Sequence, residues 1–211
     1  LPSFGTDSPL IPIDIDPPAH SGYRKILLPM FTPMAIKKLE PGMHQTAQEL
    51  ADELIASADD DGVVDASHQF ARPMPTIIFS RLAGYPEEDW SQFDRWVDEI
   101  IAHRTQNPEQ AFIAGKELYA YMQKLIDERR KNPTSSDDIM NKLLNAKVDG
   151  RDLTDEELLS YGYLLFLAGL ETTAWAIRAS IWYLAQNKEA QQKLRDNPEL
   201  IPNAAEEFLR T

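Results

Sequence analysis

Apolar residues recur every three or four positions along most of the chain, which is the period of a helix. Met43, Ala47, Leu50 and Leu54 show this spacing clearly, and it places them on one helical face. The same pattern predicts helices over residues 17–30, 33–55, 65–83, 87–103, 108–131, 136–146 and 188–196, with a last one opening at residue 202. Residues 1–19 are proline-rich and predict a loop. No β-rich stretch or repeat interrupts the pattern, so the sequence predicts an all-α fold.

Prolines and glycines refine the boundaries of these predicted helices. Pro41 predicts a bend within the second helix, and Pro73 and Pro75 predict a break within the third. Gly84 is expected to end that helix as a C-terminal cap. The stretch 148–151 predicts a short turn or small hairpin.

The longest predicted helix covers residues 154–187 and begins at a strong start signal. Thr154 and Glu157 fit a capping box, in which each side chain bonds the other residue's free backbone amide. The apolar middle of this helix contains Ala-Gly-Leu-Glu-Thr-Thr at 168–173. Glycine costs about 1 kcal/mol in a helix interior relative to alanine, and an unpaired buried carboxylate costs more. We therefore expect the backbone hydrogen bonds to open locally here, at a site.

Two interpretations of this motif remain open. In the functional one, Ala168 and Gly169 leave a shallow patch, and Glu171 and Thr172 hold water or relay protons beside it. An apolar cavity on the same face would be lined by Leu164, Leu167 and Ala168. In the structural one, Gly169 permits close helix packing and Glu171 pairs with an arginine.

Composition narrows the class of protein. The chain has 211 residues, a formal net charge of −13 and no cysteine. The charge argues against nucleic acid or an anionic membrane as a main partner. The apolar stretch Leu158–Leu170 is too short to span a bilayer. The absence of cysteine excludes disulfides and thiolate ligands from these residues. We expect a cytoplasmic, single helical domain over 1–211, and an incomplete piece of a longer protein, since neither end resembles a domain boundary.

Two charged pairs complete the candidate chemistry. His20 and Arg24 are four residues apart, so they share a helical face and are able to grip a carboxylate. The alternative is an exposed basic face. Glu207 and Arg210 are three residues apart and predict a local ion pair of the kind that is common on surfaces. No metal-ligand spacing is present among the histidines.

Together these features resemble the cytochrome P-450 family of heme-thiolate monooxygenases, in particular its soluble bacterial type. The string at 168–173 matches the family's oxygen-activating helix motif, A/G-G-x-D/E-T-T/S, at every position. The stretch around His20 and Arg24 resembles the family's approach to the heme-covering helix, and Glu207 with Arg210 resembles its Glu-x-x-Arg helix. Residues 82–90 resemble the loop that enters the substrate-covering helices.

The resemblance implies a role for each residue. His20 and Arg24 would bind a heme propionate, and Ala168 and Gly169 would lie against the heme. Glu171 and Thr172 would be catalytic and deliver protons during oxygen activation. Leu164 and Leu167 would touch an apolar substrate, and Glu207 and Arg210 would be structural. A ferredoxin or flavoprotein would supply two electrons.

One departure from the family is decisive for activity. The family's axial cysteine, which donates electron density to iron, follows the Glu-x-x-Arg helix and is absent from these residues. The resemblance therefore implies a central fragment, lacking also the N-terminal sheet, that is inactive alone although its intact parent hydroxylates an apolar small molecule. Two other hypotheses remain: a noncatalytic helical binding module, or a fragment that self-associates through exposed core surface.

Overall fold

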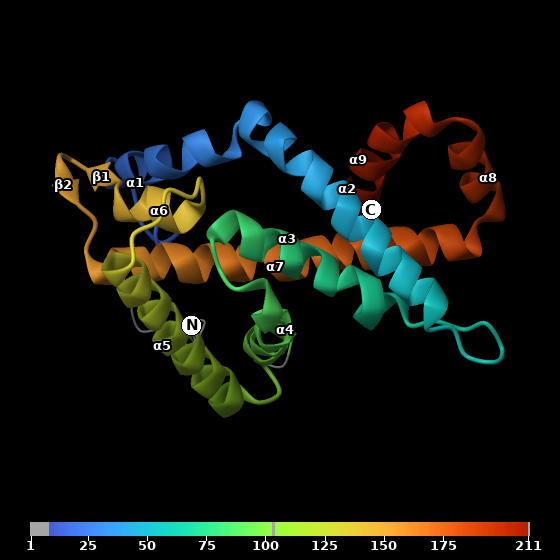
Figure 1. The fold of residues 1–211 in the computed structure, drawn as a ribbon, viewed down its shortest axis with the longest axis horizontal. Helices are drawn as coiled ribbons and strands as arrows, with labels where there is room; N and C mark the ends of the chain where they lie inside the picture. Colours follow the sequence, from blue (N-terminus) through green and yellow to red (C-terminus); the bar gives the residue numbers. More distant parts are fainter. Residues whose placement is uncertain (1–8, 103, 211) are drawn as a thin grey trace.

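The computed structural model describes residues 9–102 and 104–210, and helices dominate this part of the chain (Figure 1). The elements are, in order, α1 (Ala19–Leu27), η1 (Leu28–Phe31), α2 (Pro33–Ala56), η2 (Ser67–Ala71), α3 (Pro73–Ala83), η3 (Glu87–Asp89), α4 (Trp90–Val97), η4 (Asp98–Ala102), α5 (Pro108–Lys131), α6 (Ile139–Leu144), β1 (Lys147–Val148), β2 (Arg151–Asp152), α7 (Asp155–Gln186), α8 (Lys188–Asp196), η5 (Pro198–Leu200) and α9 (Ile201–Arg210). The all-α prediction is confirmed, and the two short strands form one antiparallel hairpin.

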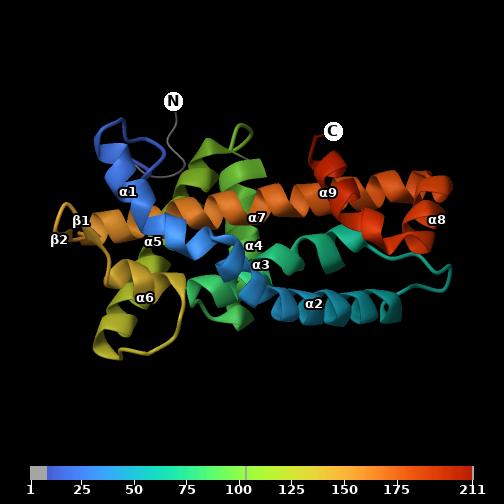
Figure 2. The same cartoon turned by 90° about the horizontal axis from the view of Figure 1, so that it is seen from above.

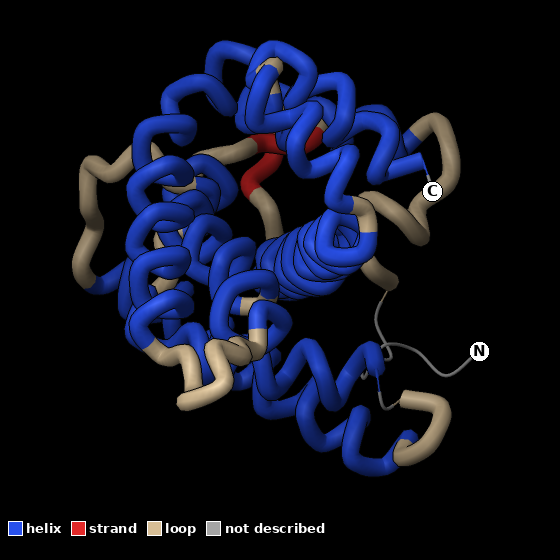
Figure 3. The backbone as a smooth tube through the Cα atoms, turned by 90° about the vertical axis from the view of Figure 1, so that its right-hand side faces the viewer, coloured by secondary structure: helices blue, strands red, loops and turns tan. Residues whose placement is uncertain are grey.

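Helix α7 runs the length of the molecule and organises the rest (Figures 1 and 2). Its 32 residues extend about 48 Å at the usual rise per residue. Helices α3, α5 and α6 pack against its first half, and α8 and α9 fold back against its second half. Viewed along the long axis, α7 lies near the centre, with other helices above it, to its left and below it, and the hairpin lies behind them (Figure 3).

The core forms two clusters along α7. One is aromatic and joins α3, α4, α5 and α7, with Phe93 and Phe166 edge to face at 5.5 Å between ring centroids. Phe93 and Trp96 are buried there, as their helical spacing indicates, whereas Trp90 is only half-buried. The second cluster gathers mainly aliphatic residues from the N-terminal segment, α5, α6 and the start of α7.

Several predicted boundaries change in detail. Helix α2 continues through Pro41, and the stretch 65–83 divides into a π-helical turn and α3, which begins at Pro73. The predicted helix over 136–146 is shorter, because the Asp138 side chain caps it by accepting from the Asn141 amide. Gly84 caps α3 with a φ of 79°, a conformation that glycine adopts without strain. Of the predicted N-terminal loop, residues 1–8 lie outside the described residues.

Within the described residues, α7 is long and apolar enough to cross a membrane by length and composition alone, as the core helices of globular proteins also are. The sequence argument considered only the uninterrupted apolar stretch Leu158–Leu170. In the structure, α3, α5 and α6 pack against the first half of α7, as neighbouring helices do around the core helix of a globular protein.

The beginning of α7 is fixed by a single carboxylate. The capping box between Thr154 and Glu157 forms as predicted, and Glu157 also receives two hydrogen bonds from Arg151, at 2.7 and 2.8 Å, and one from the Tyr23 hydroxyl at 2.6 Å. The Tyr161 hydroxyl donates to the backbone carbonyl of Tyr23 at 2.7 Å. These bonds join the hairpin, α1 and α7.

The Glu157 network predicts a specific loss of stability in acid. The hydrogen bonds from Arg151 lower the pKa of Glu157 to about 2, against the opposing effect of burial, and the Tyr23 hydroxyl and Thr154 amide add to the lowering. A folded-state pKa below the ordinary 4.5 means that the network stabilises the fold fully above pH 4.5 and loses this contribution as the pH falls from 4.5 towards 2. We expect Glu157→Gln to lower the unfolding free energy at pH 7 by about 2 kcal/mol and to flatten its slope over that acid range.

Urea unfolding between pH 7 and pH 2.5 measures both quantities. Asp152→Asn is the matched control, because it removes an exposed carboxylate of the same hairpin that pairs with Lys147, and solvent screens such pairs. Equal pH slopes for the wild type and Glu157→Gln would contradict the assignment.

Candidate functional site

The motif at 168–173 lies in uninterrupted α-helix. The Thr172 hydroxyl donates to the Ala168 carbonyl at 2.7 Å, which satisfies it within its own helix. The expectation of a local opening of the backbone is therefore wrong for this structure. A threonine is able to occupy a helix interior in this way because its hydroxyl reaches the carbonyl four residues back.

Gly169 is used for helix packing. A Cβ at this position would lie 3.3 Å from Cδ2 of Phe79 in α3, so the missing side chain permits close contact with α3. That Ala168 and Gly169 both lie against one ligand stays a prediction, although neighbouring helical residues point about 100° apart. Ala168 is exposed, while Gly169 faces α3.

Ala168 and Thr172 lie on an open face of α7. Both are exposed, and Trp175 and Trp182 continue the same face with 63% and 67% of their surface accessible. We call these four residues the open face. Its small residue and its hydroxyl stand side by side, which suits a flat group lying against the helix.

Glu171 is turned away from the open face. Its carboxylate forms an ion pair with Arg178 at 2.6 Å, and the two side chains are only 15% and 25% exposed. The packing role of Gly169 and the arginine partner of Glu171 are both features of the structural interpretation. The structure thus brings Glu171 and Thr172 into neighbouring positions without bringing their polar atoms together.

The two leucines predicted to touch substrate differ from each other. Leu167 is 6% exposed and belongs to the aromatic core cluster, and its predicted contact with substrate stays a prediction. Leu164 is half-buried at the edge of that cluster. The sequence pattern did not separate them, since both are apolar and lie within one turn.

His20 and Arg24 lie together on α1, with His20 half-buried and Arg24 exposed. Within residues 9–102 and 104–210, neither side chain has a carboxylate partner, whereas Arg72, Arg129 and Arg151 are each paired. Helix α1 is held at the start of α7 by the Tyr23 contacts, and Ala168 follows Tyr161 by about 10 Å along the helix axis. Both side chains are therefore available to bind an acidic group.

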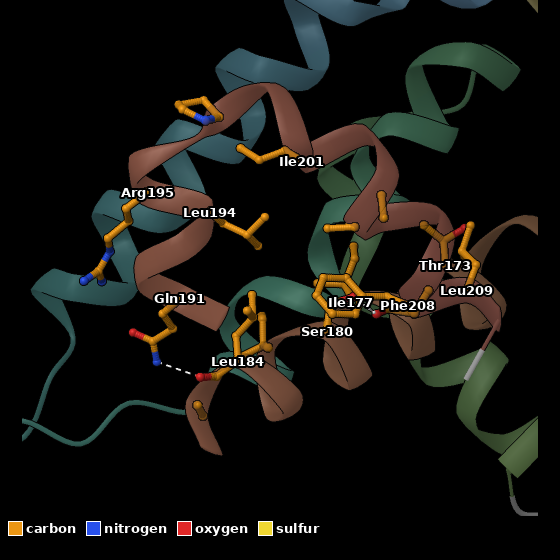
Figure 4. A pocket seen from close by; sticks show the side chains of 16 residues that line it. Thr173, Ile177, Ser180, Leu184, Gln191, Leu194, Arg195, Ile201, Phe208 and Leu209 are labelled. Atoms are coloured by element: carbon orange, nitrogen blue, oxygen red, sulfur yellow. Dashed lines mark hydrogen bonds between the residues drawn. The ribbon is translucent and has the colours of Figure 1, made fainter. Parts of the chain in front are cut away.

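An apolar groove that the sequence analysis did not identify lies beside the motif helix. It encloses about 950 Å³ between the second half of α7, α8 and α9 (Figure 4). Ile177 and Leu184 line it from α7, and Ile201 and Phe208 line it from α9. The signal was present as amphipathic spacing in two helices, but a groove requires their relative placement, which spacing alone does not give.

Glu207 and Arg210 form the predicted local ion pair, with a second contact from Arg210 Nε to Glu207 Oε2 at 3.0 Å. Both side chains are more than half exposed. Solvent-exposed pairs of this kind contribute little to stability, so a core-locking role for the pair stays a prediction.

The residues present fit one side of a heme site. The open face offers a flat wall and His20 with Arg24 offers hydrogen-bond donors for acidic groups, whereas an axial thiolate is absent from all 211 residues. Among the described residues, no cluster of three histidine, aspartate or glutamate side chains is placed to hold a metal ion.

Comparison with known proteins gives a consistent result. The family model described as Cytochrome P450 matches residues 13–206. The polyketide biosynthesis cytochrome P450 PksS of Bacillus subtilis is 37% identical over 92% of the chain and 47% of its own length. Cytochrome P450(MEG) of Priestia megaterium is 35% identical over 99% of the chain and 52% of its own length. The chain thus spans about half the length of the curated relatives that it matches.

Solved structures agree with these sequence relatives. The structure of PksS superposes with a TM-score of 0.82 at 37% identity, covering 92% of this chain and 49% of that one. A mutant of P450 EryK in complex with erythromycin B gives a TM-score of 0.84 at 30% identity, covering 99% and 54%. A family match over most of the chain, relatives above 30% identity and the same helical arrangement show that this chain belongs to the cytochrome P450 family.

Proposed function

We propose that this chain is the central part of a heme-thiolate monooxygenase that hydroxylates an apolar small molecule with dioxygen and two electrons. The observation that carries the proposal is the open face of α7, where exposed Ala168 and Thr172 stand beside each other in a member of the cytochrome P450 family. The proposal covers residues 1–211 as one helical domain of a larger enzyme. It places the enzyme in the cytoplasm and gives it a ferredoxin or flavoprotein as electron donor.

The heme, when bound, supplies the activation of dioxygen, and this chain supplies the surroundings. Ala168 leaves room for a flat group against α7. His20 and Arg24 hold its acidic side chains, with the arginine fork suited to two parallel hydrogen bonds. Leu164 borders the site on the apolar side.

Proton supply is the proposed role of the acid and the hydroxyl. Thr172 Oγ1 now donates to the Ala168 carbonyl, and rotation of its side chain would direct the same proton outward from the open face. Glu171 is able to exchange protons with solvent, because its carboxylate is partly exposed. A carboxylate and a hydroxyl in neighbouring positions form a short route from solvent to the open face.

Structures of relatives support an apolar substrate class. Among the solved structures are CYP109E1 from Bacillus megaterium in complex with testosterone and the myxobacterial CYP267B1 in complex with myristic acid. Both ligands are largely hydrocarbon. We propose the same class for the enzyme that contains this chain.

The proposed thiolate chemistry predicts a spectroscopic difference between the full-length enzyme and this chain. The full-length enzyme, reduced and treated with carbon monoxide, should show the shifted absorption that a thiolate-ligated ferrous heme gives. The 211-residue chain, which has no cysteine, should show no such shift after heme titration and should have no monooxygenase activity. A full-length sequence without a heme-loop cysteine would contradict the proposal, and a stable monomeric chain that binds no heme would favour a noncatalytic binding module.

The role of Thr172 predicts uncoupled turnover in its absence. In the full-length enzyme, Thr172→Ala should reduce the product formed per electron pair by about tenfold or more, since the proton donor at the open face is lost. Thr173→Ala is the matched control, because Thr173 lines the groove between α7 and α9. The measurement is the amount of product formed per electron pair taken from the electron donor. Unchanged coupling in Thr172→Ala would refute the assigned role.

The groove between α7, α8 and α9 favours self-association as a second property of the isolated chain. Ile201 and Leu209 line it with 52% and 66% of their surface exposed, and apolar surface of this kind promotes association. Sedimentation velocity at several concentrations should show dimers or larger species, reduced by Leu209→Glu but not by Ile55→Glu at the end of α2. A strict monomer at all concentrations would contradict this.

A further inference from the structure

Two oxidisable side chains, Trp96 of α4 and Tyr121 of α5, lie in contact at the edge of the aromatic core cluster. Their ring centroids are 5.3 Å apart, within the usual range for interacting aromatic rings. Trp96 is buried and Tyr121 is half-buried. Tryptophan and tyrosine lose a single electron more readily than phenylalanine or histidine, and no cysteine thiol competes with them in this sequence. The contact therefore joins two side chains between which an electron is able to move.

Each of these rings donates its polar hydrogen to a carboxylate. The Tyr121 hydroxyl donates to Asp89 Oδ2 at 2.5 Å, and Trp96 Nε1 donates to Glu117 Oε2 at 2.9 Å. Burial and the bond to Asp89 raise the pKa of Tyr121, so the phenol keeps its proton until it is oxidised. A phenol that loses an electron becomes a strong acid, and a carboxylate within hydrogen-bond reach is placed to take its proton.

The two carboxylates differ in their ability to accept a proton. Glu117 is paired with Arg95 at 2.6 Å, and the hydrogen bonds from Arg95 and Trp96 hold its pKa below the ordinary value. The Arg95 guanidinium carbon also lies 5.7 Å from the Trp96 ring centroid, where its charge opposes a positive charge on that ring. Asp89 has no cationic partner within the described part of the chain and accepts only from Tyr121. Oxidation is thus expected to end at Tyr121.

Aromatic contacts continue from this pair to the middle of α7. Trp96 stacks on Phe93 at 6.0 Å between centroids, and Phe93 meets Phe166 of α7 edge to face at 5.5 Å. Phe166 lies 6.2 Å from Phe79, the ring on which Gly169 packs. Electron transfer weakens steeply with distance, so rings in contact offer a short route between α7 and the half-buried phenol.

We propose that Trp96 and Tyr121 form a redox-active pair that reduces strong one-electron oxidants, such as oxygen-derived radicals. One electron passes from Tyr121, through Trp96, to the oxidant. The phenolic O–H bond breaks, its proton forms an O–H bond on the Asp89 carboxylate, and a neutral tyrosyl radical remains. A small thiol in solution then returns a hydrogen atom to the phenol oxygen and becomes a thiyl radical, and Asp89 releases its proton to water. This activity is separate from the proposed hydroxylation and requires neither Thr172 nor a bound heme.

The pair is tested in this chain, without heme, by a photo-oxidant attached at one position. Because the sequence has no cysteine, Gln92→Cys on the exposed side of α4 provides a single thiol for a ruthenium polypyridyl complex. A flash with an electron acceptor present oxidises the complex, and electron paramagnetic resonance of the frozen sample identifies the radical formed. We expect a neutral tyrosyl radical. Trp96→Phe should lower its yield, and an unchanged yield would overturn the role of the pair.

Variants of the phenol and of its proton acceptor identify the radical site. Tyr121→Phe keeps the ring and should lose the tyrosyl signal. Asp89→Asn leaves Tyr121 in place and should also lose the signal, because an amide does not take up the proton. Tyr119→Phe is the matched control in the same helix, since the Tyr119 ring contacts Tyr163 at 4.8 Å, and it should retain the signal. A tyrosyl signal that survives in Tyr121→Phe or in Asp89→Asn, or that disappears in Tyr119→Phe, would overturn the proposal.

Discussion

The arrangement of the candidate site depends on one carboxylate, that of Glu157. It closes the capping box of α7, pairs with Arg151 of the hairpin and accepts the hydroxyl of Tyr23 in α1. Three segments that are distant in sequence are thus fixed at one end of α7. Because α1 carries His20 and Arg24, this junction sets their distance from Ala168 and Thr172 further along the helix. The start of α7 therefore determines where α1 lies relative to the middle of the helix.

Helix α7 then distributes the six residues of its motif among different environments. Gly169 faces α3 and Phe79, Ala168 and Thr172 lie on the open face, and Thr173 borders the apolar groove. Glu171 lies between the core and the open face, where Arg178 holds it. A rotation of about 100° per residue is sufficient to produce this separation. The structural and functional interpretations of the motif are therefore compatible, because different residues of one string serve each.

The sequence predicted the helices well, and it predicted the side-chain surroundings only where they are local. The capping box at Thr154 and Glu157 and the Glu207–Arg210 pair depend on residues a few positions apart. The burial of Leu167, the Phe79 contact of Gly169 and the groove depend on how helices pack, which a period of 3.6 residues does not specify. The Glu171–Arg178 pair spans two turns, beyond the usual spacing of three or four residues, and so was not predicted as a specific contact.

The open face contains two tryptophans whose fluorescence depends on their surroundings. Trp175 and Trp182 are largely exposed there, whereas Trp96 is buried in the core and Trp90 is half-buried. Indole emission moves to shorter wavelength when water is removed and is quenched by a chromophore lying nearby. Any segment or prosthetic group that covers this side of α7 will therefore change the colour or the intensity of the chain's intrinsic fluorescence. Tryptophan fluorescence thus reports whether the open face is covered, without an added label.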